Sequence, residues 1–263
     1  MKPKALVLQA HGSNRDFDVM DALTLAGADA TGIPLNELRM DKTLLSDFNL
    51  LVVPGGFSYA DALGAGKLLA LDLASYFADE ISAFVESDKP VIGICNGFQA
   101  LVKSGILPGK KKEEKRKNES DVTLTFNAEG HFECRWVDLA PVSQTCIWTQ
   151  GLEENIICPI AHGEGNFQIS ELFSLSAFIE QDQIALTYVY TNGVPANGHY
   201  PTNPNGSLLD IAGICNPQGN VLGLMPHPEN HIYQWQHPRH TRGETEGSGL
   251  KLFENGVKYA SQI

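Results

Sequence analysis

The sequence between residues 91 and 99, V-I-G-I-C-N-G-F-Q, constrains the fold more than any other stretch. Apolar residues around Gly93 form a short run typical of a buried strand, and a helical stripe of apolar residues follows and ends at Gly105. Cys95 lies at the junction, with glycine two positions before it and two positions after it. A cysteine on a sharp strand-to-helix turn has the arrangement of a nucleophile elbow, usually written G-x-S-x-G.

Two interpretations of Cys95 are open at this point. A nucleophile on such a turn needs small flanking residues, because the turn forces its backbone into a poorly populated conformation. The helix N-terminus that follows favours a thiolate and offers backbone N–H groups to a developing oxyanion. The other interpretation is a buried structural cysteine before a loop. An isolated G-x-C-x-G does not decide between them.

The first part of the chain alternates between short apolar runs and helical patterns. This alternation is typical of a parallel sheet with helices on both faces, in which ligands gather at the carboxyl ends of the strands. Pro54-Gly55-Gly56 and Cys95 both follow apolar runs, so we expect them to be neighbours. The expected strands are residues 4–10, 33–39, 50–53 and 91–94, and the expected helices are residues 15–27, residues 61–86 with a break near Gly64 or Gly66, and the stretch that ends at Gly105.

The second part of the chain is predicted to be rich in strands. Residues 122–126 and 132–139 alternate around a turn, which suggests a hairpin. We also expect strands at residues 184–190, 208–214 and 221–225, a polar loop at residues 159–167 and a helix at residues 247–260. No linker divides the chain. Residues 1–263 are therefore expected to form a single three-layer α/β domain, a mostly parallel open sheet flanked by helices, with a β-rich C-terminal half.

A charged run at residues 110–117 interrupts this pattern with a net charge of +4, from six Lys and Arg against two Glu. We interpret it as part of a solvated surface loop at about residues 109–120. An electrostatic contact with a partner or an anionic substrate is the alternative.

Composition excludes several classes of protein. A net charge of −12 and a pI near 5.0 argue against a nucleic-acid partner and against binding to an anionic membrane. The apolar run at residues 5–8 is too short for a signal peptide or a membrane span. Five scattered cysteines without a C-x-x-C motif favour reduced thiols, and hence a cytoplasmic location.

A cysteine nucleophile needs a base, and the base needs a group that orients it. The best candidate is His227 with Glu229, directly after an apolar run; the prolines beside His227 favour an extended backbone that would project both side chains to one side. His162, with Glu164 two residues on, is the alternative base, or else a substrate or partner contact. A metal site that includes His131 and Cys134 is possible, but the spacing is not distinctive, and we expect no metal.

An acyl-transfer site also needs an oxyanion hole. Gly55 and Gly56 follow an apolar run and present backbone N–H groups at no steric cost. An ordinary strand-ending turn is the alternative. The P-G-G, G-x-C-x-G-x-Q and P-H-P-E motifs, each at a strand end, are much more specific together than any one alone.

These motifs resemble those of the class I (triad) glutamine amidotransferases. The elbow and P-H-P-E identify the class, and P-G-G-F-S-Y, A-H-G-E-G and N-P-N-G-S narrow the resemblance to the glutaminase subunits of phosphoribosylformylglycinamidine (FGAM) synthase. The resemblance implies the flavodoxin-like fold of that class. The matching segments, in family order, are Gly12-Ser13-Asn14, Pro54-Gly55-Gly56-Phe57-Ser58-Tyr59, Gly93-Ile94-Cys95-Asn96-Gly97-Phe98-Gln99, Phe132-Glu133-Cys134-Arg135, Ala161-His162-Gly163-Glu164-Gly165, Asn203-Pro204-Asn205-Gly206-Ser207, Asp210-Ile211-Ala212-Gly213-Ile214 and Met225-Pro226-His227-Pro228-Glu229.

The resemblance also implies a role for individual residues. Cys95 would attack the side-chain amide of L-glutamine, His227 would shuttle the proton, and Glu229 would orient His227. A glutamyl thioester would form, ammonia would leave, and water would release glutamate. The backbone N–H groups of Gly56 and Asn96 would form the oxyanion hole. The residues that would help to hold the glutamine are Gly55, Gln99, Asn127 and Phe132.

In such enzymes the ammonia passes to a partner. The resemblance implies a PurL-type synthetase subunit, which uses ATP and Mg²⁺ to convert formylglycinamide ribonucleotide (FGAR) to its amidine in purine biosynthesis, and commonly a small PurS-type subunit. This chain has no P-loop of its own, so we expect no cofactor in it.

Two features depart from the family pattern, and two other functions stay open. His11 stands where the family usually has proline, and the run at residues 110–117 is longer and more basic than the resemblance predicts. One alternative is a stand-alone thiol hydrolase, such as a γ-glutamyl peptidase or a PfpI-like protein, although PfpI-like proteins lack P-H-P-E. The other alternative is a catalytically inactive assembly module, against which the intact triad argues.

Overall fold

The computed structural model describes residues 2–109, 122–170, 175–244 and 247–263. The charged run at residues 110–117, and with it the loop predicted at about residues 109–120, lies outside the described residues apart from Gly109. The prediction that residues 1–263 form one domain stays a prediction.

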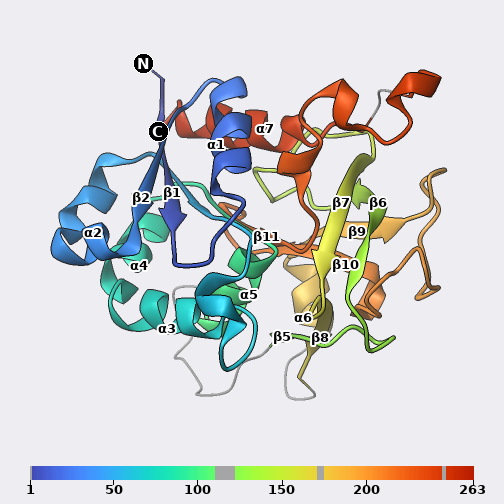
Figure 1. Cartoon of the computed structure of the whole chain (residues 1–263), viewed down its shortest axis with the longest axis horizontal. Coiled ribbons are helices and arrows are strands. Elements are labelled where there is room, and N and C mark those ends of the chain that lie inside the picture. The colour runs from blue at the N-terminus through green and yellow to red at the C-terminus, as the bar shows by residue number, and fades with distance from the viewer. Residues whose placement is uncertain (1, 110–121, 171–174, 245–246) are drawn as a thin grey trace.

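In the described part of the chain, nine strands form one sheet (Figure 1). The first five in spatial order pair in parallel, and the remaining four pair antiparallel. The predicted parallel sheet and β-rich C-terminal half are therefore confirmed. In spatial order the strands are β2 (Asp29–Pro34), β1 (Lys4–Gln9), β3 (Leu50–Val53), β4 (Val91–Ile94), β11 (Val221–Leu224), β10 (Ile211–Cys215), β9 (Ile184–Val189), β6 (Glu133–Pro141) and β7 (Ile156–His162).

Helices cover both faces of the parallel half, which confirms the three layers. Figure 1 shows α1 (Asp16–Leu25) and α7 (Leu250–Ala260) above the sheet, and α3 (Lys67–Ser75), α4 (Ala78–Glu86) and α5 (Asn96–Lys103) below it. The short helices α2 (Leu35–Met40) and α6 (Leu175–Glu180) follow β2 and precede β9. Among the described residues, no helix has the length and apolar character needed to cross a bilayer.

The central strands are buried because they are covered from both sides. Every residue of β3, β4 and β11 is buried, as the continuous apolar runs in the sequence predict. β4 and β11 pair in register, so Ile94 lies opposite Leu224 and both strands end at the same edge of the sheet. The residues that follow them, Cys95 and Met225, therefore begin their loops side by side.

The structure corrects two predicted elements of the first part of the chain. The strand expected at residues 33–39 ends at Pro34, and α2 follows because Leu35 and Leu38, three positions apart, are both buried on one helical face. The helix expected at residues 61–86 is two helices, and the first starts after Gly66, one of the two predicted break points, in the left-handed conformation at φ 69°.

The structure also corrects the predicted hairpin. β5 (Val122–Thr125) pairs with β8 (Asn166–Ile169) in a separate two-stranded sheet, whereas β6 pairs with β7 and β9. The loop expected at residues 159–167 is wrong at both ends, because β7 runs to His162 and β8 begins at Asn166. Alternation predicts β5 and β6, but neither β7 nor β8, and the choice of partner strand depends on long-range packing.

Glycines let α5 approach the sheet closely. Gly93 and Gly223 are register partners on β4 and β11. A Cβ atom on Gly223 would lie 2.1 Å from a ring carbon of Phe98, and one on Gly93 would lie 2.4 Å from a methyl group of Leu101. The helix behind the elbow therefore rests on the sheet at two positions that carry no side chain.

We expect Gly223→Ala to destabilise the protein by about 1–3 kcal/mol, because the added methyl group overlaps the Phe98 ring. Urea denaturation of the two single variants and of the double variant with Phe98→Ala measures this. The double variant should be more stable than the sum of the two single effects predicts, because the smaller side chain makes room for the methyl group. Strict additivity would contradict this packing.

Candidate active site

Cys95 has the backbone conformation of a nucleophile elbow. Its φ is 50° and its ψ is −106°, outside the regions that an ordinary residue adopts. A Cβ atom on Gly97 would lie 1.9 Å from the carbonyl oxygen of Val53, so only glycine fits there. The strained turn and its glycine flanks agree with the nucleophile interpretation, since such strain is concentrated at functional sites.

The candidate nucleophile, Cys95, lies at a helix N-terminus and in a cleft. α5 begins at Asn96, so its first N–H groups have no acceptor within the helix and face the region of the thiol. Cys95 lines a cleft of about 190 Å³. Its Sγ is 3.8 Å from the carbonyl oxygen of Ala161 on β7, because the antiparallel half of the sheet curls back towards β4.

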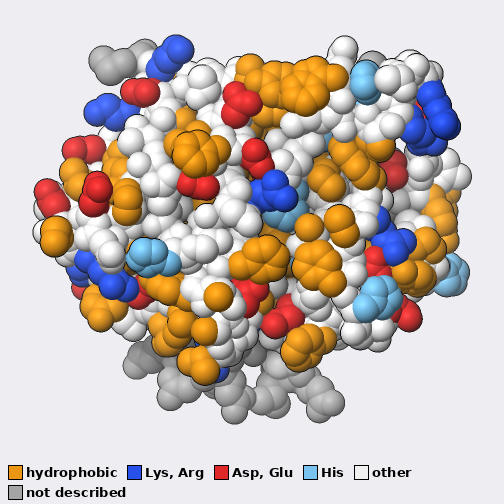
Figure 2. Space-filling view, viewed as in Figure 1, with side chains coloured by type: hydrophobic (Ala, Val, Ile, Leu, Met, Phe, Trp, Pro, Cys, Tyr) orange, Lys and Arg blue, Asp and Glu red, His pale blue; other side chains and the backbone are white. Residues whose placement is uncertain are grey.

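Aromatic side chains that could contact a ligand also line the cleft. Phe57, Phe126 and Phe132 line it and are each about half exposed or more. Hydrophobic and acidic side chains lie together near the middle of the face shown in Figure 2. Of the residues predicted for the site, Cys95, Gly56, Gln99 and Phe132 line the cleft.

His227 and Glu229 form a buried pair beside the cleft. Nδ1 of His227 lies 2.7 Å from Oε1 of Glu229, and their exposed fractions are 4 % and 0 %. The backbone between them is a single 3₁₀ turn, Pro228–Asn230, and not the extended segment that the flanking prolines suggest. His227 and Glu229 still form a pair, because the 3₁₀ turn also brings together residues that are two positions apart in the sequence. The backbone N–H of His227 donates to the carbonyl of Pro159 at 2.8 Å, which anchors the turn to β7.

Negative charges near His227 favour its protonated form. Burial alone would lower its pKa, but the negative charges of Glu229 and of the Cys95 thiolate, and hydrogen bonds to both, raise the pKa of His227 to about 10. An imidazolium beside the Cys95 sulfur, with a carboxylate behind it, is therefore stable near neutral pH. This is the arrangement that activates a cysteine nucleophile.

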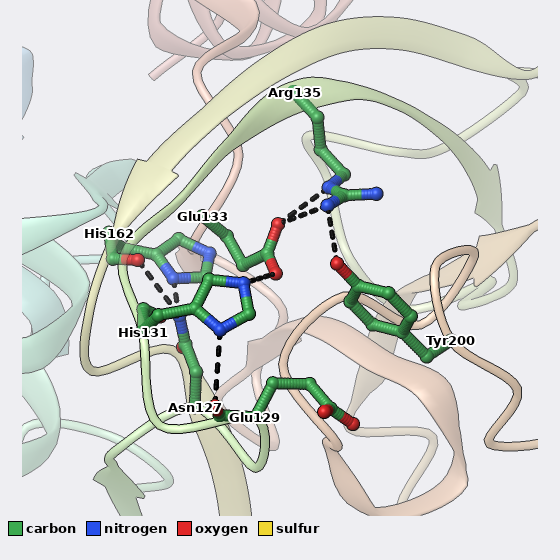
Figure 3. Close-up of polar contacts among 7 residues, drawn as sticks. All are labelled: Asn127, Glu129, His131, Glu133, Arg135, His162 and Tyr200. Atoms are coloured by element: carbon green, nitrogen blue, oxygen red, sulfur yellow. Dashed lines mark hydrogen bonds and ion pairs between the residues drawn. The ribbon is translucent and has the colours of Figure 1, made fainter.

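His162, the alternative base, is held neutral. Burial and the nearby charge of His227 lower the pKa of His162 to about 3. Its Nδ1 lies 3.2 Å from Oδ1 of Asn127, as Figure 3 shows. The carboxylate of Glu164, two residues on, contacts Lys103 and the backbone of Ala65 instead. His162 thus has no acidic partner of the kind that His227 has.

The glycines of the predicted oxyanion hole are tightly fitted. Gly56 has φ 130°, and a Cβ atom there would lie 2.6 Å from the backbone nitrogen of Asn14. A Cβ atom on Gly55 would lie 2.8 Å from Cε1 of His227. The loop after β3 therefore packs directly against the candidate base, because β3 and β11 lie on either side of β4 and end at the same edge of the sheet.

The side chain of Asn96 ties this loop to the elbow. Its Oδ1 accepts from both the backbone N–H and the hydroxyl of Ser58, and its Nδ2 donates to Oδ1 of Asp61 at 2.9 Å and to Oε1 of Gln99 at 3.1 Å. All the hydrogen-bonding capacity of this buried amide is used. Because Ser58 is two residues from Gly56, Asn96 fixes both sides of the predicted oxyanion hole.

Among the residues predicted to bind glutamine, Gln99 and Asn127 are hydrogen-bonded to other protein groups, whereas the side chain of Phe132 is available to a ligand. The amide of Gln99 is engaged by Asn96 and by the carbonyl of Glu164, at 2.7 Å, so its side chain supports the cleft wall. Asn127 donates to the carbonyls of His131 and His162, both at 2.9 Å, and lies outside the lining of the cleft. Phe132 is left free to contact a ligand. A direct contact of any of these residues with substrate stays a prediction.

Glu133, the residue after Phe132, is at the centre of an ion-pair network, which Figure 3 shows. Glu133, 2 % exposed, contacts Nε of Arg135 at 2.6 Å and Nε2 of His131 at 2.8 Å, and Arg135 donates to the hydroxyl of Tyr200 at 2.7 Å. His131 is therefore paired with a carboxylate rather than with Cys134. Within the described ranges, no cluster of three or more His, Cys, Asp and Glu residues could hold a metal ion.

Asp61 was not predicted to belong to the site, and Glu164 was predicted only as the acidic neighbour of His162. Both carboxylates line the cleft. Asp61 carries no sequence signal, because it lies in a predicted helix that is instead an irregular loop. Residues 59–61 all have positive φ in that loop, which no periodicity predicts.

The raised pKa of His227 predicts how stability depends on pH. When the pKa of a group is higher in the folded protein than in the unfolded chain, the group contributes its full stability at pH values below the unfolded-state pKa. This contribution is lost as the pH rises through the folded-state pKa. We expect the contribution of His227 to the free energy of unfolding to be complete below pH 6.5 and to decline towards pH of about 10. Urea denaturation of the protein and of His227→Gln across this range measures it; a difference that grows with pH would contradict the assignment.

Comparison with known proteins agrees with this geometry. Residues 2–260 match the family model described as a CobB/CobQ-like glutamine amidotransferase domain. The chain is 53% identical to the phosphoribosylformylglycinamidine synthase subunit PurQ of Treponema denticola, over 98% of this chain and 99% of that protein. It is 42% identical to PurQ of Dehalococcoides mccartyi, over 100% and 99%. A chain in the solved structure of PurLQS from Thermotoga maritima is similar, with a TM-score of 0.73, 33% identity, and coverage of 98% and 99%. The chain therefore belongs to the CobB/CobQ-like glutamine amidotransferase family.

Proposed function

We propose that the chain is the glutaminase subunit of phosphoribosylformylglycinamidine synthase, a PurQ protein. The observation that carries this proposal is the pairing of a strained Cys95 with the buried His227–Glu229 pair at adjacent strand ends. The match to the glutamine amidotransferase family model supports L-glutamine as the substrate, and full-length similarity to PurQ proteins supports the synthase. Five free cysteines support a reducing, cytoplasmic setting.

In this reaction the thiolate of Cys95 attacks the amide carbon of the glutamine side chain. Backbone N–H groups of Gly56 and Asn96 receive the oxyanion. The His227 imidazolium gives its proton to the leaving nitrogen, so ammonia departs and a glutamyl thioester remains. Neutral His227 then takes a proton from water, and the hydroxide attacks the thioester. Collapse releases glutamate and restores the thiolate–imidazolium pair.

The change of role of His227 follows from its surroundings. The charge of the Cys95 thiolate is one cause of the raised pKa of His227. Acylation removes that charge, so the pKa of His227 falls and the group becomes a better proton acceptor. The same imidazole thus serves first as acid and then as base, with Glu229 holding it in place throughout.

The ammonia is passed to a partner. The similar chain in PurLQS from Thermotoga maritima supports a PurL-type synthetase subunit and a PurS-type small subunit as partners. ATP and Mg²⁺ would then act on the synthetase, where FGAR is converted to FGAM. The present chain would need no cofactor of its own.

Replacement of the nucleophile tests the proposal. We expect Cys95→Ala to lower glutaminase activity by at least about 10³-fold, both for the purified chain and for the chain with its synthetase and nucleotide ligands. Release of glutamate and ammonia measures this. Stimulation of the unmodified chain by the synthetase separates a glutaminase subunit from a stand-alone hydrolase. Full activity of the variant would refute the nucleophile role, and a chain without any glutaminase activity in the complex would indicate an assembly module.

The side chain of Asn96 gives a second test. Asn96→Ala keeps the backbone N–H but frees the loop that carries Gly56, so we expect kcat to fall roughly tenfold or more, because transition-state stabilisation is lost. KM should change little. Ser58→Ala, which removes one hydrogen bond to Asn96 and leaves the others, is the matched control and should cause a smaller loss. An unchanged kcat in Asn96→Ala would show that Asn96 does not hold the loop.

A further inference from the structure

The loop after β3, which carries Gly56, has a strained backbone. Tyr59, Ala60, Asp61 and Leu63 all have φ between 52° and 65°, although none of them is glycine. A residue with a Cβ atom avoids this left-handed region, because the Cβ atom crowds the following carbonyl oxygen. Such strain persists only where the surrounding structure enforces it. The loop therefore depends on anchors near these residues.

The first anchor is the turn after β1. The backbone N–H of Phe57 donates to the carbonyl of Gly12 at 3.0 Å, and that of Tyr59 donates to the carbonyl of His11 at 2.6 Å. The ring of His11 also meets the ring of Tyr59 edge-on, with the two centroids 6.4 Å apart. His11, which stands where the family usually has proline, therefore holds Tyr59 from one side.

The second anchor is a buried carboxylate on α3. The hydroxyl of Tyr59 donates to Oδ2 of Asp72 at 2.5 Å, and Asp72 is only 7 % exposed. Burial of the phenol, its hydrogen bond to Asp72 and the charge of Asp72 raise the pKa of Tyr59 to about 12. The hydroxyl therefore keeps its proton near neutral pH and remains a donor to the carboxylate.

Asp72 is itself held in place by α2. The guanidinium of Arg39 pairs with Oδ1 of Asp72, and its Cζ lies 4.4 Å above the ring centroid of Tyr76. Because Arg39 occupies one carboxylate oxygen, the other oxygen is fixed in the position where it accepts from Tyr59. A buried carboxylate is costly unless it is paired in this way.

The two neighbouring residues Ser58 and Tyr59 are thus tied to different elements. Ser58 is bound to Asn96 at the start of α5, and Tyr59 is bound to Asp72 on α3. Asp72 lies outside the lining of the cleft, and the thiol chemistry does not use it. A contact of Asp72 with the strained loop is the one route by which this carboxylate can influence the reaction.

We propose that Asp72 is a positioning residue for the oxyanion hole. It holds Tyr59, and through Tyr59 it holds the loop that carries Gly56 in the conformation that receives the oxyanion. The role rests on the proposed function, because it matters only if a tetrahedral intermediate forms at Cys95.

Two variants that remove the same hydrogen bond test this role. Tyr59→Phe keeps the ring and loses the hydroxyl, and Asp72→Ala loses the acceptor. With the synthetase present, kcat for hydrolysis of L-glutamine should fall roughly 5- to 10-fold in each, the effect expected for the loss of one hydrogen bond, while KM changes little. Tyr59→Phe keeps the test decisive if the Asp72 variant fails to fold.

The double variant shows whether Asp72 acts through Tyr59. Its kcat should be no lower than that of Asp72→Ala alone, because both changes remove one and the same contact. Losses that multiply in the double variant would mean that Asp72 acts by another route, and they would overturn the proposal.

Alkylation by iodoacetamide separates a misplaced oxyanion hole from a damaged nucleophile. The thiolate of Cys95 displaces iodide from a saturated carbon, so no oxyanion forms in this reaction. The alkylation rate of Cys95, followed by mass spectrometry of its peptide, should therefore be unchanged in both single variants. A fall in this rate as large as the fall in kcat would place the damage at the elbow and contradict the role of Asp72.

A matched control removes another partly buried ion pair. Glu80 on α4 pairs with Lys42 at 3.3 Å, so Glu80→Ala also takes a carboxylate from a helix. It should leave kcat unchanged. A loss of kcat as large as that in Asp72→Ala would show that a general loss of stability, rather than the position of the loop, lowers the rate.

The unmodified protein separates the two possible failures. If the chain and its synthetase release no ammonia from L-glutamine, the proposed function fails, and the positioning role fails with it. If they hydrolyse L-glutamine and Tyr59→Phe keeps the full kcat, only the role of Asp72 fails.

Discussion

The parallel pairing of β4 with β11 is the interaction on which the site depends. The N–H of Cys95 donates to the carbonyl of Leu224 at 2.8 Å, and this bond completes a ladder between two fully buried strands. Because the strands end together, the elbow and the turn that carries His227 start from fixed neighbouring points. Glycines behind this ladder bring α5 close, so the helix N-terminus lies at the nucleophile. Backbone pairing, rather than contacts between side chains, therefore determines where the reactive groups lie relative to one another.

Two histidines in the same buried region show how neighbouring groups determine the pKa of an imidazole. His227 faces Glu229 and Cys95, and its pKa rises; His162 faces the amide of Asn127, and its pKa falls. Burial acts on both in the same direction, so the difference comes from the charged neighbours. One imidazole is thereby suited to carry a proton and the other to accept a hydrogen bond without taking the proton away.

Much of the fold and the centre of the site could be predicted from the sequence. The elbow, the glycines after β3 and the histidine after β11 are local signals, because short apolar runs end where parallel strands end. The pairing of β5 with β8 and the approach of Ala161 to Cys95 could not be predicted, since they depend on how the antiparallel half curls. Asp61 was missed for a related reason: its loop is held in left-handed conformations by tertiary hydrogen bonds to Asn96 rather than by its own sequence.

The contact between the turn at His227 and β7 has a consequence for the whole molecule. β7 is the last strand of the sheet, and an open edge of this kind is a template for pairing with other chains. Its outward backbone groups are occupied: the carbonyl of Pro159 accepts from His227, and the N–H of Ile157 donates to Gly247. The segment that carries the proposed catalytic base therefore also covers the edge of the sheet. Loosening this segment would expose an aggregation-prone edge, so solubility and catalysis are under the same structural constraint.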